Sequence, residues 1–237
     1  MAIKEIKYNG NSYPISYIQK GNSDKVILFL HGWGSNKEIM YGSFGKYLNN
    51  FKHIYVDLPG FGNSPNSNFL TTNDYSNIIE LFLKELNIKA DIIVGHSFGG
   101  KVATLLKPTT LVLLSSAGIL VPKPLKVKVK IAIFKLLKPL GFSKLRTLFV
   151  ADDAKQMNSG MYETFKYVVN EDFEHNFSKF NGKAILFWGK KDSATPFWTA
   201  QKIKDYIKDS KLYPLDGDHF FFVNHSKFIS ETIEKEL

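Results

Sequence analysis

The sequence predicts an α/β fold with a mainly parallel, doubly wound sheet. Strand-like and helix-like segments alternate along the 237 residues, which is typical of a parallel sheet covered by helices on both faces. Residues 26–30 form a continuous apolar run, as expected of a strand buried on both faces. The length suits one α/β domain with an insertion better than two independent domains.

The individual elements follow from periodicity and turn residues. The chain opens with two alternating segments joined around Asn9-Gly10, which predict a first pair of strands. The strand candidates are residues 3–9, 12–19, 26–30, 53–56, 90–94, 111–114, 184–187 and 212–213. The helix candidates are residues 38–48, 75–86, 100–106, 198–207 and a last helix from about 226. Asn73 or Asp74 is the expected cap of the helix at 75–86.

One long segment interrupts the alternation. Residues 116–180 lie between two strand candidates and far exceed the usual connection of about two to six residues. We therefore expect a core made of residues 1–115 and 181–237, with residues 116–180 forming a lid over the functional site.

The pentapeptide Gly95-His96-Ser97-Phe98-Gly99 follows a short apolar strand and precedes a helix candidate. A serine on such a strand–turn–helix unit has a strained backbone, and its hydroxyl projects beyond the edge of the sheet. Gly95 and Gly99 let the strand and the helix approach each other where a Cβ would collide. The context favours Ser97 as a catalytic nucleophile.

The base that activates such a serine has to reach it from the same edge of the sheet. His219 lies in a polar turn between the last strand and the last helix and is the best-placed candidate among six histidines. His96 adjoins Ser97, but we expect its side chain to point away from the serine. The others are less suitable: His31 lies in another loop, His53 begins a strand, His175 lies in the insertion and His225 starts the last helix.

A carboxylate should hold the histidine in one tautomer. Asp192 follows the strand at 184–188, so that serine, acid and histidine come in the order expected for a nucleophile elbow of this kind. Asp57 also follows a strand and is an alternative acid. Asp216 and Asp218 are candidates for capping the last helix.

The loop His31-Gly32-Trp33-Gly34 follows the strand at 26–30. Attack on a carbonyl produces an oxyanion that needs preorganised N–H donors. The backbone N–H groups of Trp33 and Phe98 are the two candidates. The aromatic candidates for an apolar acyl pocket are Trp33, Tyr41, Phe98, Trp198, Phe220 and Phe221.

As a set, these motifs resemble the α/β-hydrolase superfamily, in its lid-bearing branch of small bacterial esterases and carbon–carbon bond hydrolases. The matching stretches are 31–34, 57–64, 95–100, 188–192 with Thr195-Pro196, and 217–219. The resemblance implies an α/β-hydrolase sheet, a helical lid, and a serine hydrolase that needs no metal or organic cofactor. It also implies cleavage of a carboxylic ester or thioester of a small to medium acyl group through an acyl-enzyme. The alternatives are a carbon–carbon bond hydrolase of a vinylogous diketone and a non-catalytic ligand-binding protein on the same fold.

Composition limits the setting and the partners. The chain has no cysteine, which excludes disulfides and thiol catalysis and is compatible with a cytoplasmic protein. No apolar stretch reaches the roughly 20 residues needed to span a bilayer, and the first residues do not resemble a signal peptide. Nothing in the sequence indicates nucleic-acid binding.

The net charge of +9 is concentrated in the predicted lid. Between residues 117 and 150 there are eight basic side chains and no acidic one: Lys123, Lys126, Lys128, Lys130, Lys135, Lys138, Lys144 and Arg146. Such a cluster can steer a small acidic substrate, an acidic acyl carrier protein or an anionic surface towards the lid. A solvated lysine-rich face is the alternative.

Overall fold

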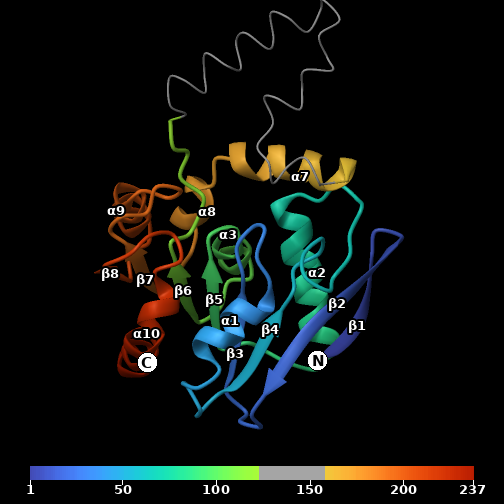
Figure 1. The fold of residues 1–237 in the computed structure, drawn as a ribbon, viewed down its shortest axis with the longest axis horizontal. Helices are drawn as coiled ribbons and strands as arrows, with labels where there is room; N and C mark the ends of the chain where they lie inside the picture. Colours follow the sequence, from blue (N-terminus) through green and yellow to red (C-terminus); the bar gives the residue numbers. More distant parts are fainter. Residues whose placement is uncertain (123–157) are drawn as a thin grey trace, which may run out of the picture.

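The computed structural model describes residues 1–122 and 158–237. Its centre is an eight-stranded sheet with the strand order β1-β2-β4-β3-β5-β6-β7-β8 (Figure 1). The strands are β1 Ala2–Tyr8, β2 Asn11–Lys20, β3 Val26–Leu30, β4 Lys52–Val56, β5 Ile92–His96, β6 Thr110–Leu114, β7 Lys183–Gly189 and β8 Ser210–Leu215. The pairs β1–β2 and β2–β4 are antiparallel, and every pair from β4–β3 to β7–β8 is parallel.

Helices cover both faces of this sheet. They are α1 Lys37–Phe44, α2 Thr72–Glu85, α3 Phe98–Leu105, α7 Ser159–Asn170, α8 Glu174–Ser178, α9 Phe197–Tyr206 and α10 Phe222–Glu236. Alternate residues of β3 face different cores: Leu28 packs in a cluster with α2, α3 and α9, and Phe29 packs in a cluster with α1 and α10. The predicted doubly wound, mainly parallel α/β sheet is confirmed.

Three predicted helix boundaries were wrong, each for a local reason. The cap of α2 is Thr71, which forms a capping box with Asp74: the Thr71 hydroxyl accepts the Asp74 N–H, and the Asp74 carboxylate accepts the Thr71 N–H. The helix α1 ends at Phe44, four residues before the predicted Leu48, whose positive φ of 53° is not helical. The last helix begins at Phe222, so His225 lies within it and does not start it.

Two described helices, α7 and α8, belong to the predicted lid. In Figure 1, α7 lies across the end of the sheet to which the arrows of β5 and β6 point. The boundaries of the lid at 116–180 stay a prediction, and its eight basic residues between 123 and 146 lie outside the described residues. None of the helices described in residues 1–122 and 158–237 is long and apolar enough to cross a membrane.

Candidate active site

Ser97 occupies a sharp turn between β5 and α3, with φ 51° and ψ −116°. Such a backbone conformation in a residue other than glycine costs on the order of 1–3 kcal/mol, and it persists only where the surroundings enforce it. The surroundings are tight: a Cβ on Gly95 would lie 2.5 Å from the Gly99 carbonyl oxygen, and one on Gly99 would lie 2.5 Å from the Leu30 carbonyl oxygen. The two glycines therefore allow the strained turn, as the pentapeptide motif predicts.

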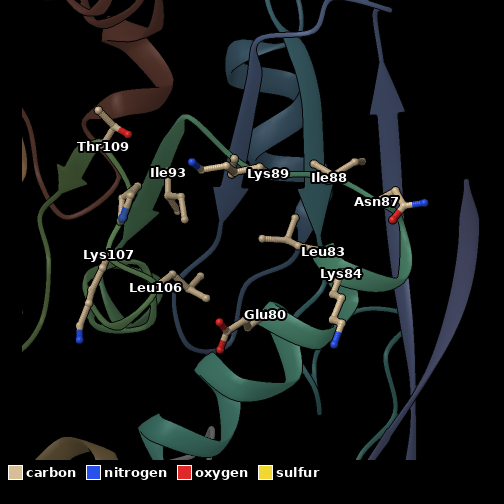
Figure 2. Close-up of a pocket in the computed structure, with 12 residues that line it drawn as sticks. Glu80, Leu83, Lys84, Asn87, Ile88, Lys89, Ile93, Leu106, Lys107 and Thr109 are labelled. Carbon is tan, nitrogen blue, oxygen red and sulfur yellow. The ribbon is translucent and has the colours of Figure 1, made fainter.

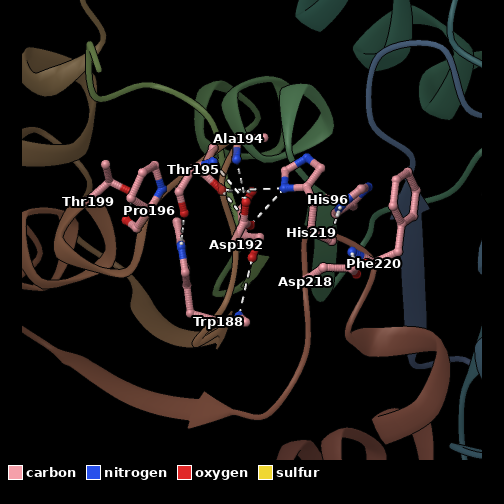
Figure 3. Close-up of polar contacts among 12 residues, drawn as sticks. His96, Trp188, Asp192, Ala194, Thr195, Pro196, Thr199, Asp218, His219 and Phe220 are labelled. Atoms are coloured by element: carbon pink, nitrogen blue, oxygen red, sulfur yellow. Dashed lines mark hydrogen bonds and ion pairs between the residues drawn. The ribbon is translucent and has the colours of Figure 1, made fainter. Parts of the chain in front are cut away.

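His219 and Asp192 lie in adjacent turns at the carboxyl ends of β8 and β7. Their side chains meet with a distance of 2.7 Å between His219 Nδ1 and Asp192 Oδ2 (Figure 3). The turns pack closely, because a Cβ on Gly189 would lie 2.3 Å from the Asp218 carbonyl oxygen. With Nδ1 donating its proton to the carboxylate, neutral His219 has an unprotonated Nε2 that can accept a proton. The structure thus brings together the predicted base and acid.

Asp192 is held as a carboxylate by its own turn. Oδ1 accepts the N–H groups of Ala194 at 2.8 Å and Thr195 at 2.9 Å, and the Thr195 hydroxyl donates to Oδ2 at 2.9 Å. Burial raises the pKa of Asp192, but the hydrogen bonds from His219 and Thr195 outweigh it and lower this pKa to about 2. No role was predicted for Thr195. Its position three residues after an aspartate in a turn is the signal for such a hydrogen bond.

His96 makes a contact that the sequence did not predict. Its ring packs against the His219 ring with 4.7 Å between centroids, and its Nε2–H donates to the His219 carbonyl oxygen at 3.0 Å (Figure 3). Burial and the neighbouring His219 lower the pKa of His96 to about 3, so the ring is neutral. His96 therefore supports the backbone of His219.

Asp57, the alternative acid, has other partners. Its buried carboxylate accepts the Lys37 backbone N–H at 2.7 Å, the Lys37 ammonium at 2.6 Å and the Asn63 N–H at 2.9 Å. These bonds connect the segment after β3 to the segment after β4. Because the carboxylate is committed to them, Asp57 does not orient His219.

The two other aspartates considered in the sequence also lie apart from the His219 imidazole. Asp216 pairs with Lys191 at 3.0 Å, and Asp218 accepts the Phe220 N–H at 2.8 Å. The cap position of α10 is Phe221. Neither aspartate is therefore the cap of the last helix.

The loop after β3 lies next to the serine. A Cβ on Gly32 would be 3.0 Å from Ser97 Cβ and 2.8 Å from His96 Nδ1, so only glycine allows the loop to come this close. The ring of His31 holds the loop: Nδ1–H donates to the Gly32 carbonyl oxygen at 2.7 Å, and Nε2 accepts the Leu58 N–H at 3.0 Å. Burial lowers the pKa of His31 to about 4. The His31 ring therefore fixes the loop beside Ser97.

Aromatic rings from α3, α7 and the turn after β4 contact the Trp33 indole. Centroid distances are 4.8 Å to Phe61, 5.6 Å to Phe98 and 5.4 Å to Phe165 of α7. Phe165 was not among the predicted pocket residues, because its contact with Trp33 joins distant parts of the chain. We call Trp33, Phe61, Phe98 and Phe165 the aromatic wall.

The other predicted pocket aromatics lie in different surroundings. Phe220 stands edge-on to the His219 ring at 5.7 Å. Phe221 is buried in the core on the α1 and α10 side of the sheet, and Tyr41 packs against Tyr55 of that same core. Trp198 is exposed. Phe221 therefore belongs to the core, whereas Tyr41 is exposed and packs on the edge of the core through Tyr55.

A pocket of about 600 Å³ lies elsewhere, where the C-terminal ends of α2 and α3 meet the amino ends of the strands (Figure 2). Its apolar lining includes Leu83, Ile88 and Leu106, and lysines stand at its margin. None of the predicted site residues lines it. Within residues 1–122 and 158–237 there is no cluster of three or more side chains able to hold a metal ion.

Comparisons with known proteins identify the family and the fold. Residues 27–231 match the family described as "Alpha/beta hydrolase family", so the chain belongs to the α/β-hydrolase family. The structure is similar to that of an esterase from Exiguobacterium antarcticum, with a TM-score of 0.76, 21% sequence identity and 98% of each chain covered. This likeness shows the fold.

Curated relatives match over a shorter region. The chain is 36% identical over 84 residues to the pimeloyl-[acyl-carrier protein] methyl ester esterase of Pectobacterium carotovorum. This match covers 35% of this chain and 31% of that protein. It is 31% identical over 90 residues to the dihydrolipoyllysine-residue acetyltransferase component of the acetoin cleaving system of Cupriavidus necator, covering 38% of this chain and 24% of that protein. The matched regions therefore span about a quarter to a third of these two relatives.

Proposed function

We propose that this protein is a serine hydrolase that cleaves a carboxylic ester or thioester of a small to medium acyl group through an acyl-enzyme. The observation that carries the proposal is the 2.7 Å hydrogen bond between His219 Nδ1 and Asp192, at the same edge of the sheet as the strained Ser97 turn. The order Ser97, Asp192, His219 along the chain also supports it. The relative named a methyl ester esterase and the structural neighbour named an esterase are consistent with this reaction.

In the proposed mechanism, the Ser97 hydroxyl attacks the ester carbonyl while Nε2 of His219 takes its proton. Asp192 holds the imidazole in the required tautomer and offsets its positive charge. The backbone N–H groups of Trp33 and Phe98 stabilise the oxyanion; Phe98 opens α3, where a backbone N–H has no acceptor within the helix.

Collapse of the tetrahedral intermediate breaks the bond to the alcohol oxygen, and His219 gives its proton to that oxygen. The alcohol leaves, and the acyl group remains on Ser97. A water molecule then attacks the acyl-enzyme, with His219 again taking the proton and returning it to Ser97 as the acid product departs.

The aromatic wall supports an apolar acyl group as the substrate portion nearest the serine. We further propose that the basic residues between 123 and 146 attract an acidic partner, such as an acyl carrier protein or an anionic surface. The matched relative that acts on a pimeloyl-[acyl-carrier protein] methyl ester is consistent with an acidic carrier.

Ser97→Ala tests the proposal. We expect the variant to fold normally but to lose hydrolysis of p-nitrophenyl esters by several orders of magnitude and to lose labelling by a fluorophosphonate probe. Ser43→Ala is the matched control: it makes the same substitution at a buried serine of α1, whose hydroxyl donates to the Ile39 carbonyl oxygen. This control should keep both activities.

Wild-type turnover by folded Ser97→Ala would contradict the nucleophile. Absence of probe labelling in the wild-type protein would favour a non-catalytic binding protein. Turnover of a vinylogous diketone without turnover of any ester would favour the carbon–carbon bond hydrolase.

A further inference from the structure

The indole N–H of Trp33 has no hydrogen-bond acceptor in the part of the chain that the structure describes, although its nitrogen is buried. Leaving a buried N–H unpaired costs on the order of 1–3 kcal/mol, so such groups need an explanation. The fold satisfies another buried indole of this chain, because Trp188 Nε1–H donates to the Thr195 carbonyl oxygen at 2.7 Å. Within the described residues the Trp33 indole is thus left without an acceptor where the Trp188 indole has one, and the other buried unpaired side-chain atoms there are Ser16 Oγ and His96 Nδ1.

The neighbours of this indole explain why it is unpaired. Phe61, Phe98 and Phe165 form its ring contacts, and a phenyl side chain carries no oxygen or nitrogen that could accept. An edge-to-face ring provides at most a weak contact to an N–H group. The donor thus faces apolar surroundings.

The position of Trp33 relates this donor to the proposed reaction. The preceding residue, Gly32, approaches Ser97 so closely that a Cβ there would lie 3.0 Å from Ser97 Cβ. The Trp33 ring also contacts Phe98, the residue that follows the serine. A substrate acyl group attached to Ser97 would therefore extend alongside the aromatic wall.

We propose that Trp33 Nε1–H is a specificity-determining donor for an oxygen atom carried by the acyl chain of the substrate. This inference rests on the proposed function, and it assigns the substrate to a class: an acyl ester with a neutral carbonyl oxygen further along the chain. The phenyl rings accommodate the methylene groups, and the indole N–H pairs with the oxygen. With an unsubstituted acyl chain the indole N–H stays unpaired, so the enzyme stabilises the transition state of that substrate less well.

A neutral oxygen fits the site better than a carboxylate. The aromatic wall carries no formal charge. The buried ammonium of Lys37, in the helix that follows the Trp33 loop, is already paired with Asp57 at 2.6 Å and Glu38 at 2.7 Å. An ionised group among the rings would lose its hydration, and the Lys37 ammonium is not free to compensate for that loss.

The experiment compares p-nitrophenyl esters in matched pairs: pentanoate with 4-oxopentanoate, hexanoate with 5-oxohexanoate, and heptanoate with 6-oxoheptanoate. We expect the wild-type protein to prefer at least one oxo ester over its partner by about tenfold or more in kcat/KM, since one hydrogen bond is gained. Trp33→Phe keeps a ring and the backbone N–H but removes the indole N–H, so it should reduce this preference to about twofold or less. The ratio within each pair cancels any general effect of the substitution on turnover.

Phe61→Leu is the matched control, because it changes the shape of the aromatic wall and leaves the donor in place. Its oxo preference should persist. The inference is overturned if the wild-type protein shows no oxo preference in any pair, or if Trp33→Phe keeps the preference; both results leave the proposed esterase function intact. If the wild-type protein hydrolyses none of these esters, including p-nitrophenyl acetate, the proposed function fails, and the inference fails with it.

Discussion

Two buried neutral histidines should make the protein much less stable at pH 5 than at pH 7. His31 and His96 are fully buried, and burial lowers their pKa values to about 4 and about 3. Nε2 of His31 accepts the Leu58 N–H, so a proton on this nitrogen would oppose another donor. Nδ1 of His96 has no partner within the described residues, so a proton there would be a buried, unpaired charge.

The magnitude follows from the difference between the folded and unfolded states. In the unfolded chain both histidines have a pKa of about 6.5 and bind a proton below that pH. In the folded protein His31 binds its proton only near pH 4 and His96 only near pH 3. This contribution to stability is complete above pH 6.5 and decreases as the pH falls through the window between the two values. At pH 5 each of the two histidines lowers the free energy of unfolding of the protein by about 2 kcal/mol relative to pH 7, which gives about 4 kcal/mol for both.

Two other groups also affect the pH dependence of the free energy of unfolding. Burial also lowers the pKa of His53, which adds to the loss. The lowered pKa of Asp192, about 2, gives a contribution that is present above pH 4 and disappears only in stronger acid. Asp192 therefore does not contribute between pH 7 and pH 5.

Urea unfolding followed by tryptophan fluorescence at pH 7 and pH 5 measures the effect. The wild-type protein should lose about 4 kcal/mol or more, and His31→Gln should lose about 2 kcal/mol less over the same interval, whatever its stability at pH 7. His175→Gln, at an exposed position, should keep the wild-type dependence. An unfolding free energy that is equal at the two pH values, or an unchanged pH dependence in His31→Gln, would refute the reasoning.

Three further predictions concern the acid, the lid contact and the lid charge. Asp192→Asn should still fold but should lower kcat by roughly 10³ to 10⁴, because the His219 imidazole takes the wrong tautomer. A mild effect of Asp192→Asn together with a larger effect of Asp57→Asn would show that the acid is misassigned. Lys101→Met should lower the unfolding free energy by about 1–3 kcal/mol, because it removes the hydrogen bonds of a buried ammonium that pairs with Glu171 and donates to the last turn of α7 at 3.0 Å. Chemical denaturation of the double variant Lys101→Met/Glu171→Gln should show that part of this loss is recovered. If the stability losses of the two single variants simply add in the double variant, Lys101 and Glu171 are not coupled. Reversing several basic charges between 123 and 146 should slow association with an acidic carrier protein and flatten its salt dependence, measured by stopped flow, while p-nitrophenyl acetate hydrolysis barely changes; equal effects on both would indicate a misfolded lid.

The strained serine turn could be predicted from the sequence because its causes are local. A strand of apolar residues, two glycines at fixed spacing and a following helix are all contained in residues 90–106, and the steric conflict that the glycines avoid arises within that segment and against β3. The same reasoning placed His219 and the loop at 31–34 at the carboxyl edge, because parallel strands all end on one side.

The choice of acid depended on tertiary structure. Asp57 and Asp192 both follow strands, so local pattern makes them equivalent. The structure distinguishes them by partners distant in sequence: Lys37 binds the carboxylate of Asp57, and His219 binds that of Asp192. Periodicity contains no information about which of two buried carboxylates meets which cation or imidazole.

The sequence by itself thus determined the α/β class, the parallel order of the core and the edge at which chemistry can occur, because hydrophobic period and glycine sterics act over a few residues. Only the tertiary structure decided the contact of His96 with a carbonyl 123 residues away and the approach of Phe165 to Trp33. It also decided that the Trp33 indole N–H finds no acceptor among residues 1–122 and 158–237. These features depend on how separate elements pack, and packing is specified by the whole chain together.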